Sequence, residues 1–294
     1  MTAVIAAGLL VVRSGPLSTV QDLGRFGVAH QGVPRAGALD QPAYAAANRL
    51  VGNPPGAAAV ESTLGGLTVR AVDAPLLVAV TGAPAAVRVD GRPAAWGTAV
   101  RLPVGATLDV GPADFGVRSY LAVRGGIAVP PVLGSRSADL LTGLGPAPLR
   151  VGELLPIGAA GAGTGVPGVD VLPLPAMPAE LVLRLLPGPR ADWFRPDSLT
   201  ALARARYRVA PASNRVALRT EGPGLIRRRH QELASEGMVL GAVQVPPDGQ
   251  PVVFLADHPA TGGYPVLGVV PEADLAAAAQ ARPGIPVRFV PARR

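Results

Sequence analysis

Residues 230–265 read HQELASEGMVLGAVQVPPDGQPVVFLADHPATGGYP and hold much of the chemistry that this sequence can offer. Two of the chain's three histidines, His230 and His258, lie in this stretch. A histidine side chain can accept or donate a proton near neutral pH. Glu232 follows His230 by two residues, so a β-strand would place both side chains on one face. We therefore predict that His230 and Glu232 act as general acid or base.

The apolar run PVVFLA in the same stretch ends at Asp257, and a sharp turn, TGGYP, follows shortly after. A strand that leaves a core at a carboxylate can deliver that group to the mouth of a site, so Asp257 joins the predicted catalytic residues. Glycines permit close approach of the backbone, and their N–H groups can bind an oxyanion. The turn residues predicted to bind substrate are Thr261, Gly262, Gly263 and Tyr264.

Each of these residues also has a structural explanation. His230 could form a structural pair, Asp257 could close an Asx turn, and the two glycines could serve only a hairpin. His258 precedes Pro259 at the end of a strand, and we predict that it is exposed rather than catalytic.

Three further groups of polar residues, one of them inside residues 230–265, suit a small anionic ligand. Asn214 and Arg215, in PASNR, fit a carboxylate clamp or a simple turn. Gln244, in GAVQVP, can offer a side-chain amide. The loop GVPRAGALD leads into a helix N-terminus, which favours anions, although it could equally be a plain capped turn. The predicted binding residues of this loop are Arg35, Gly37 and Asp40.

The elements that must position these residues are mostly short strands. The sequence contains 37 Gly and 33 Pro, which break helices and bound many short apolar runs. Runs such as PLLVAVTG and ATLDVG recur every 8 to 12 residues or so, as in a barrel or sandwich. Three helices are predicted: residues 40–52, with Asp40 as N-cap and Gly52 at the end; 196–207, capped by Asp197 or Ser198; and 271–280.

The length of 294 residues suggests two domains, at roughly 150 residues each. A stretch rich in small residues and proline, 158–180, separates the halves, so we predict domains 1–160 and 161–294. Tyr120 and Phe254 lie in similar YLA and FLA triplets 134 residues apart, and the motif PVLG repeats at the same offset. These matches predict two β domains of related fold.

Composition excludes several kinds of chemistry. The chain has no Cys and no Lys, so thiol nucleophiles, Schiff bases and a biotinylated lysine are absent. Three histidines without HExxH spacing disfavour a metal site. The net charge of +7 comes from arginine alone, and aromatic residues make up only 4%, which disfavours nucleic-acid binding. No signal peptide or membrane-spanning run stands out, so we expect a soluble cytoplasmic protein.

The sequence resembles the allophanate hydrolase subunit 2 family, whose members are also called biotin-dependent carboxyltransferase-like proteins, KipA-like proteins or the C subunit of bacterial 5-oxoprolinase. The opening signature is LSTVQDLGRFGVAHQGVPRAGALDQPAYAAANRLVGNPPGAAAVESTLGG, and the middle one is GVRSYLAVRGGIAVPPVLGSRSADLLTGLG. PASNRVALRTEGP and residues 230–265 resemble the C-terminal signatures. Family members often read DxQTTGGY, where this chain has DHPATGGY, with Pro259 and Ala260 in place of Gln and Thr.

This resemblance implies a mainly β fold of two cyclophilin-like β-barrel domains with a few short helices. It also implies a component of an ATP-dependent 5-oxoprolinase that opens 5-oxo-L-proline to L-glutamate. The implied partners are a KipI-like protein and a LamB/YcsF-like protein, the other two components of that enzyme. ATP with Mg would act in the assembled complex, at a site that a partner could share.

Two other functions remain open from the sequence. One is the carboxyltransferase component of a biotin-dependent urea-type carboxylase, with biotin carried in trans because this chain has no lysine. The other is a non-catalytic regulator that binds a KipI-like kinase inhibitor.

Overall fold

The structure, a computed structural model, describes residues 7–160, 170–229 and 231–292, and divides into two compact units. The first unit comprises Met1–Arg25, Asp40–Asp139 and Gly143–Met177, and the second comprises Phe26–Leu39, Leu140–Thr142 and Pro178–Arg294. The chain therefore passes from one unit to the other several times. The predicted boundary after residue 160 adjoins residues 161–169, which lie outside the described residues.

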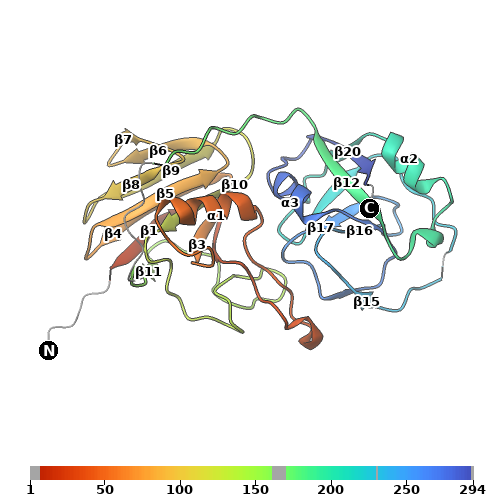
Figure 1. Ribbon diagram of the computed structural model, residues 1–294, viewed down its shortest axis with the longest axis horizontal. Helices are drawn as coiled ribbons and strands as arrows, with labels where there is room; N and C mark the ends of the chain where they lie inside the picture. Colours follow the sequence, from red (N-terminus) through yellow and green to blue (C-terminus); the bar gives the residue numbers. More distant parts are fainter. Residues whose placement is uncertain (1–6, 161–169, 230, 293–294) are drawn as a thin grey trace. The chain divides into compact units, whose positions relative to one another are not determined.

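Two antiparallel sheets form the first unit (Figure 1). One sheet runs in the order β11 (Leu154–Pro156), β1 (Gly8–Ser14), β4 (Gly65–Val72), β9 (Thr107–Ala113), β6 (Ala85–Val89) and β7 (Arg92–Ala94). The other runs in the order β2 (Leu17–Gln21), β3 (Ala59–Thr63), β10 (Arg118–Val123), β5 (Leu76–Gly82) and β8 (Ala99–Leu102). Alternate residues of β5, Leu76, Val78 and Val80, belong to the core of this unit, as the period of two in a strand requires.

Helix α1 (Gln41–Leu50) packs against β5 and β10, on the face of β5 that points away from that core. Thr81 of β5 donates its hydroxyl hydrogen to the carbonyl of Ala43 at 2.7 Å. The predicted helix is confirmed: an Asp40 carboxylate oxygen accepts the backbone N–H of Ala43 at 3.0 Å. Gly52 has the left-handed φ of 71° expected after the helix.

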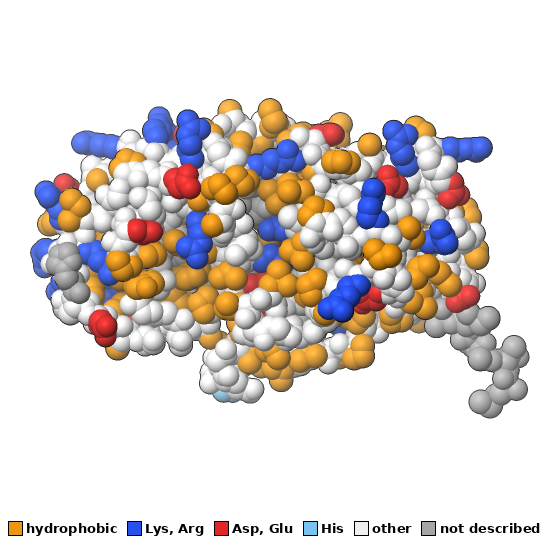
Figure 2. Space-filling view, turned by 180° about the vertical axis from the view of Figure 1, so that it is seen from behind, with side chains coloured by type: hydrophobic (Ala, Val, Ile, Leu, Met, Phe, Trp, Pro, Cys, Tyr) orange, Lys and Arg blue, Asp and Glu red, His pale blue; other side chains and the backbone are white. Residues whose placement is uncertain are grey.

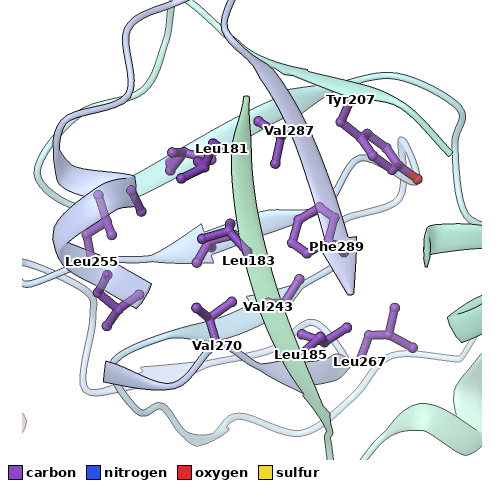
Figure 3. Packing of buried hydrophobic residues seen from close by; sticks show 14 of the residues in the cluster. Leu181, Leu183, Leu185, Tyr207, Val243, Leu255, Leu267, Val270, Val287 and Phe289 are labelled. Carbon is purple, nitrogen blue, oxygen red and sulfur yellow. The ribbon is translucent and has the colours of Figure 1, made fainter. Parts of the chain in front are cut away.

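A closed barrel forms the second unit. Its strands run in the order β12 (Leu181–Pro187), β19 (Val266–Val269), β16 (Ala242–Gln244), β17 (Val252–Phe254), β14 (Ala217–Glu221), β13 (Tyr207–Val209) and β20 (Pro286–Pro291). Leu181, Leu183 and Leu185 alternate with exposed or half-buried residues and point into the barrel (Figure 3). They meet Val287 and Phe289 of β20, which pairs with β12 in parallel. Complete burial of such a side chain contributes about 1.5–3 kcal/mol.

Short elements complete the described structure. They are α2 (Ser198–Arg204), α3 (Glu272–Ala279), the 3-10 helices η1 (Ala29–Gln31) and η2 (Ala191–Trp193), and the two-stranded pair β15 (Glu236–Gly237) and β18 (Thr261–Gly262). Both remaining predicted helices are present, but Asp197 makes no side-chain capping hydrogen bond to α2. The predicted mainly β class with a few short helices is confirmed.

On the face that Figure 2 shows, the exposed basic side chains lie in separate groups, and several are beside acidic side chains. In the described ranges, no helix combines the length and the apolar character needed to cross a membrane.

Candidate functional site

A buried ion pair joins two predicted site residues of the second unit, Arg215 and Asp257. The guanidinium Nε and Nη2 atoms each lie 2.9 Å from one carboxylate oxygen, so the pair is bidentate. The side chains are 1% and 0% exposed. Local backbone pairing sets this geometry, because the N–H of Asp257 donates to the carbonyl of Arg215 at 3.1 Å.

The same ion pair contacts the two short segments of the second unit that precede Pro178, Phe26–Leu39 and Leu140–Thr142. Nη2 of Arg215 donates to the carbonyl of Gly37 at 2.7 Å, and the N–H of Leu140 donates to Asp257 Oδ2 at 3.2 Å. The N–H of Ala36 donates to the carbonyl of Ala256 at 3.0 Å. Ala36 and Gly37 have φ values of 53° and 98°, a left-handed turn that presents the Gly37 carbonyl to the arginine.

This arrangement explains what Arg215 and Asp257 do in the described structure. The fully buried Asp257 carboxylate accepts three hydrogen bonds, two from Arg215 and one from the N–H of Leu140, so its oxygens are not left without partners. Nε and Nη2 of Arg215 both donate to Asp257, so in this structure the guanidinium predicted to bind a substrate carboxylate binds the carboxylate of Asp257. Direct roles for the two residues in catalysis and binding stay predictions.

His258 is only 6% exposed, so the prediction that it is exposed is wrong. Its Nδ1 lies 2.8 Å from the carbonyl oxygen of Pro259, which places the ring hydrogen on Nδ1. The ring centroid lies 6.3 Å from that of Phe254. The backbone N–H of His258 donates to the carbonyl of Leu255 at 3.1 Å, so a tight turn folds the ring back against the strand.

Gln244 positions the Thr-Gly-Gly-Tyr turn. Its Nε2 donates to the carbonyl of Tyr264 at 2.9 Å and lies 3.3 Å from Met238 Sδ. A Cβ atom at Gly262 would lie 2.7 Å from Gln244 Nε2, so this position has room only for glycine while the glutamine keeps its place. The exposed residues of the turn are Thr261, Gly263 and Tyr264. The turn is therefore fixed from beneath by a buried amide and open to solvent above.

The other predicted residues of this unit are Asn214, Glu232 and His230. Asn214 Oδ1 accepts hydrogen bonds from the backbone N–H groups of Val216 and Ala217 at 2.8 and 3.2 Å. Of the two roles predicted for Asn214, a carboxylate clamp or a simple turn, these bonds correspond to the turn. Glu232 is exposed and makes no hydrogen bond or ion pair with the residues that the structure describes. His230 lies outside the described residues.

The predicted anion-binding loop divides between the two units. In the second unit, the guanidinium carbon of Arg35 lies 4.6 Å from the ring centroid of Phe26. Nη1 of Arg35 lies 3.4 Å from Glu272 Oε1, so the two side chains form an ion pair. Asp40 belongs to the first unit, where it caps α1, and its N–H donates to the Tyr120 hydroxyl at 2.7 Å.

Tyr120 lies in a fully buried polar cluster of the first unit. Its hydroxyl donates to Glu61 Oε2 at 2.8 Å. Burial raises the pKa of Tyr120 well above 10, with the carboxylates of Glu61 and Asp40 adding to the effect. The phenol therefore stays protonated and serves as a hydrogen-bond donor.

Sequence reasoning missed three contributors to these sites. The backbone groups of Ala36 and Leu140 carry no signal in the sequence, because any residue type has them. Arg227 appears only as the first of three consecutive arginines, yet its guanidinium carbon lies 5.6 Å from the ring centroid of Tyr264. Across the described ranges, no three His, Asp or Glu side chains gather as metal ligands.

Comparison with known proteins places this chain in a family. Residues 31–291 match the family described as carboxyltransferase domain, subdomain A and B. The chain is 41% identical to the C subunit of 5-oxoprolinase from Escherichia coli (strain K12), over 96% of this chain and 90% of that protein. It is 32% identical to the urea amidolyase of Lachancea kluyveri, over 96% of this chain but 17% of that much longer protein.

A solved structure agrees with these sequence relationships. The crystal structure of TTHA0988 superposes with a TM-score of 0.88 and 38% sequence identity, covering 99% of this chain and 57% of that one. The expected family resemblance is confirmed by these matches. The chain belongs to the carboxyltransferase domain family, subdomains A and B.

Proposed function

We propose that this chain is the C subunit of an ATP-dependent 5-oxoprolinase, which opens 5-oxo-L-proline to L-glutamate. The observation that carries the proposal is 41% identity to the C subunit of the E. coli 5-oxoprolinase over nearly the full length of both proteins. Urea amidolyase matches this chain over only 17% of its length, so the stand-alone protein is the better counterpart.

The reaction sets clear demands on a protein site. A five-membered lactam is a stable amide, and ATP would supply activation by phosphorylation of the carbonyl oxygen, which makes the carbon a better electrophile. The protein must then hold the substrate's carboxylate, stabilise negative charge on the lactam oxygen and move protons. Water adds to the activated carbon, the C–N bond breaks, and the products are glutamate, ADP and phosphate.

The residues of the second unit suit these tasks. We assign oxyanion stabilisation to the backbone of the turn at 261–264, which Gln244 holds in place. Proton transfer falls to His230 and Glu232, both in the predicted catalytic stretch. The Arg215–Asp257 pair acts as a positioning element, because it holds the backbone at Gly37 and Leu140.

The proposed complex contains two further proteins, one KipI-like and one LamB/YcsF-like. The chain has no lysine and hence no P-loop lysine. We therefore place ATP and Mg at a site on one of these partners or shared with one.

Reconstitution from the three purified proteins tests this function directly. With all three present, ATP hydrolysis should require 5-oxo-L-proline and should yield one glutamate per ATP. Omission of any one protein should abolish coupled turnover, and L-proline in place of 5-oxo-L-proline should give none. Absence of turnover with all three proteins present would overturn the proposal.

A second candidate is the carboxyltransferase component of a urea-type carboxylase. It is favoured by the family match and by 32% identity to urea amidolyase. Because this chain has no lysine, the test supplies a biotin carboxylase and a biotinylated carrier in trans, with bicarbonate, ATP and urea. Carboxylation of urea in this mixture, together with no opening of 5-oxo-L-proline, would favour it. Tight binding to a KipI-like protein without either reaction would instead favour the regulator.

A further inference from the structure

Arg227 is a partly buried cation at the edge of the Thr-Gly-Gly-Tyr turn. Its guanidinium carbon lies 5.6 Å from the Tyr264 ring centroid, and Nη2 donates to the carbonyl of Val245. Its Nε is buried and has no hydrogen-bond partner. Burial lowers the pKa of Arg227 from its usual value, which reflects the cost of holding this charge away from water.

Two other arginines of the second unit form ion pairs, whereas Arg227 forms none with the described residues. Arg190 pairs with Glu236, and Arg229 pairs with Asp192 at 2.9 Å. Within the described ranges, no carboxylate forms an ion pair with Arg227; Asp248 favours its charge only from a longer distance. A half-buried cation without a counterion is costly, and a bound anion would offset that cost.

The position of Arg227 is fixed relative to the turn. Val245, which accepts its hydrogen bond, donates its own N–H to the carbonyl of Pro265 at 3.3 Å. The preceding residue, Gln244, holds the carbonyl of Tyr264. The guanidinium and the turn are therefore anchored to the same end of β16.

We propose that Arg227 binds the carboxylate of a small cyclic amide acid, a role that rests on the proposed function. Arg215 was the predicted clamp, but Asp257 occupies its fork, so the substrate's carboxylate needs another guanidinium. A guanidinium binds a carboxylate through two parallel hydrogen bonds. With the carboxylate held there, the ring of the acid lies against the half-exposed Tyr264 and near the amides of the turn.

The test is kinetic and uses the complex reconstituted from all three proteins. The variants are Arg227→Gln, Arg227→Lys and, as a matched control, the exposed neighbour Arg228→Gln. The substrates are 5-oxo-L-proline and 2-pyrrolidinone, which has the same lactam ring without the carboxylate. Because both substrates are measured on one preparation, the ratio of their kcat/KM values does not depend on the fraction of folded enzyme.

Arg227→Gln should lower kcat/KM for 5-oxo-L-proline by about 10- to 100-fold, the loss expected for a charge-assisted pair. The same variant should leave kcat/KM for 2-pyrrolidinone and the KM for ATP unchanged. Arg227→Lys should recover part of the preference for the acid, and Arg228→Gln should behave as the wild type.

Three outcomes have distinct meanings. A wild-type complex that does not open 5-oxo-L-proline contradicts the proposed function itself. An active wild type whose preference for the acid survives Arg227→Gln contradicts only the role of Arg227. A raised KM for ATP with an unchanged preference for the acid also overturns it, because Arg227 would then serve a phosphate.

Discussion

Replacement of Arg215 by leucine should destabilise the second unit more than most single substitutions. The change leaves the 0%-exposed carboxylate of Asp257 without a counterion and the carbonyl of Gly37 without its donor. Removal of one member of a buried pair costs about 3–5 kcal/mol, a large part of the 5–15 kcal/mol that stabilises a typical protein. The midpoint of thermal unfolding should therefore fall by on the order of 10 °C.

A double-mutant cycle separates the pair from its surroundings. Asp257→Asn keeps the shape of the side chain but removes the charge, and Arg215→Leu/Asp257→Asn removes both charges. The double variant should be less destabilised than the sum of the two single variants by about 2 kcal/mol, as for residues in direct contact.

Hydrogen exchange identifies the backbone hydrogen bonds that the substitution weakens. The N–H groups of Ala36 and Leu140 are bonded to Ala256 and Asp257, so both should exchange faster in Arg215→Leu than in the wild type. The amide of Ala43, which Asp40 caps in the first unit, is the internal control. An unchanged unfolding midpoint, or faster exchange at Ala43 alone, would refute this account of the pair.

Three further changes test other parts of the structure. Gly262→Ala should displace Gln244, because the new Cβ would lie 2.7 Å from its Nε2, and should cost about 1–3 kcal/mol by thermal unfolding; Gly263→Ala, with its nearest atom at 3.5 Å, should cost little. Asp40→Ala should lower stability by about 1 kcal/mol through loss of the α1 cap, with Asp40→Asn close to wild type in the same assay. Hydrogen bonds from Arg184 lower the pKa of Asp274 in the folded protein. The contribution of Asp274 to the free energy of unfolding is therefore complete above the unfolded pKa of about 3.9, and it is lost as pH falls through the lower folded pKa. Denaturation at pH 7 should therefore show Asp274→Asn less stable than the wild type, and the difference should shrink at low pH; a constant difference would contradict this.

Local signals in the sequence were sufficient to predict the helices and the mainly β class. Helix α1 is encoded within residues 40–52 by Asp40, a proline in its first turn and Gly52. The partners of Arg215 could not be predicted in this way. Gly37 lies 178 residues from it along the chain, and the contact uses a carbonyl that every residue type has.

The orientation of individual side chains could not be predicted from the sequence either. The neighbouring Pro259 suggested an exposed His258, but the residue is 6% exposed and its ring lies beside Phe254. Likewise, three consecutive arginines are equivalent in the sequence, and only the fold distinguishes the one beside Tyr264.

The path of the chain between the units has a consequence for dissecting the gene. A fragment that begins at Pro178 would encode every strand of the barrel, yet it would lack the Gly37 carbonyl and the Leu140 amide that complete the buried cluster around Asp257. A single cut after Met177 keeps every residue of the first unit but separates the barrel from two of its segments. Recombination at one junction therefore could not exchange the complete second unit for a foreign counterpart, and a redesign of the barrel must include those two segments.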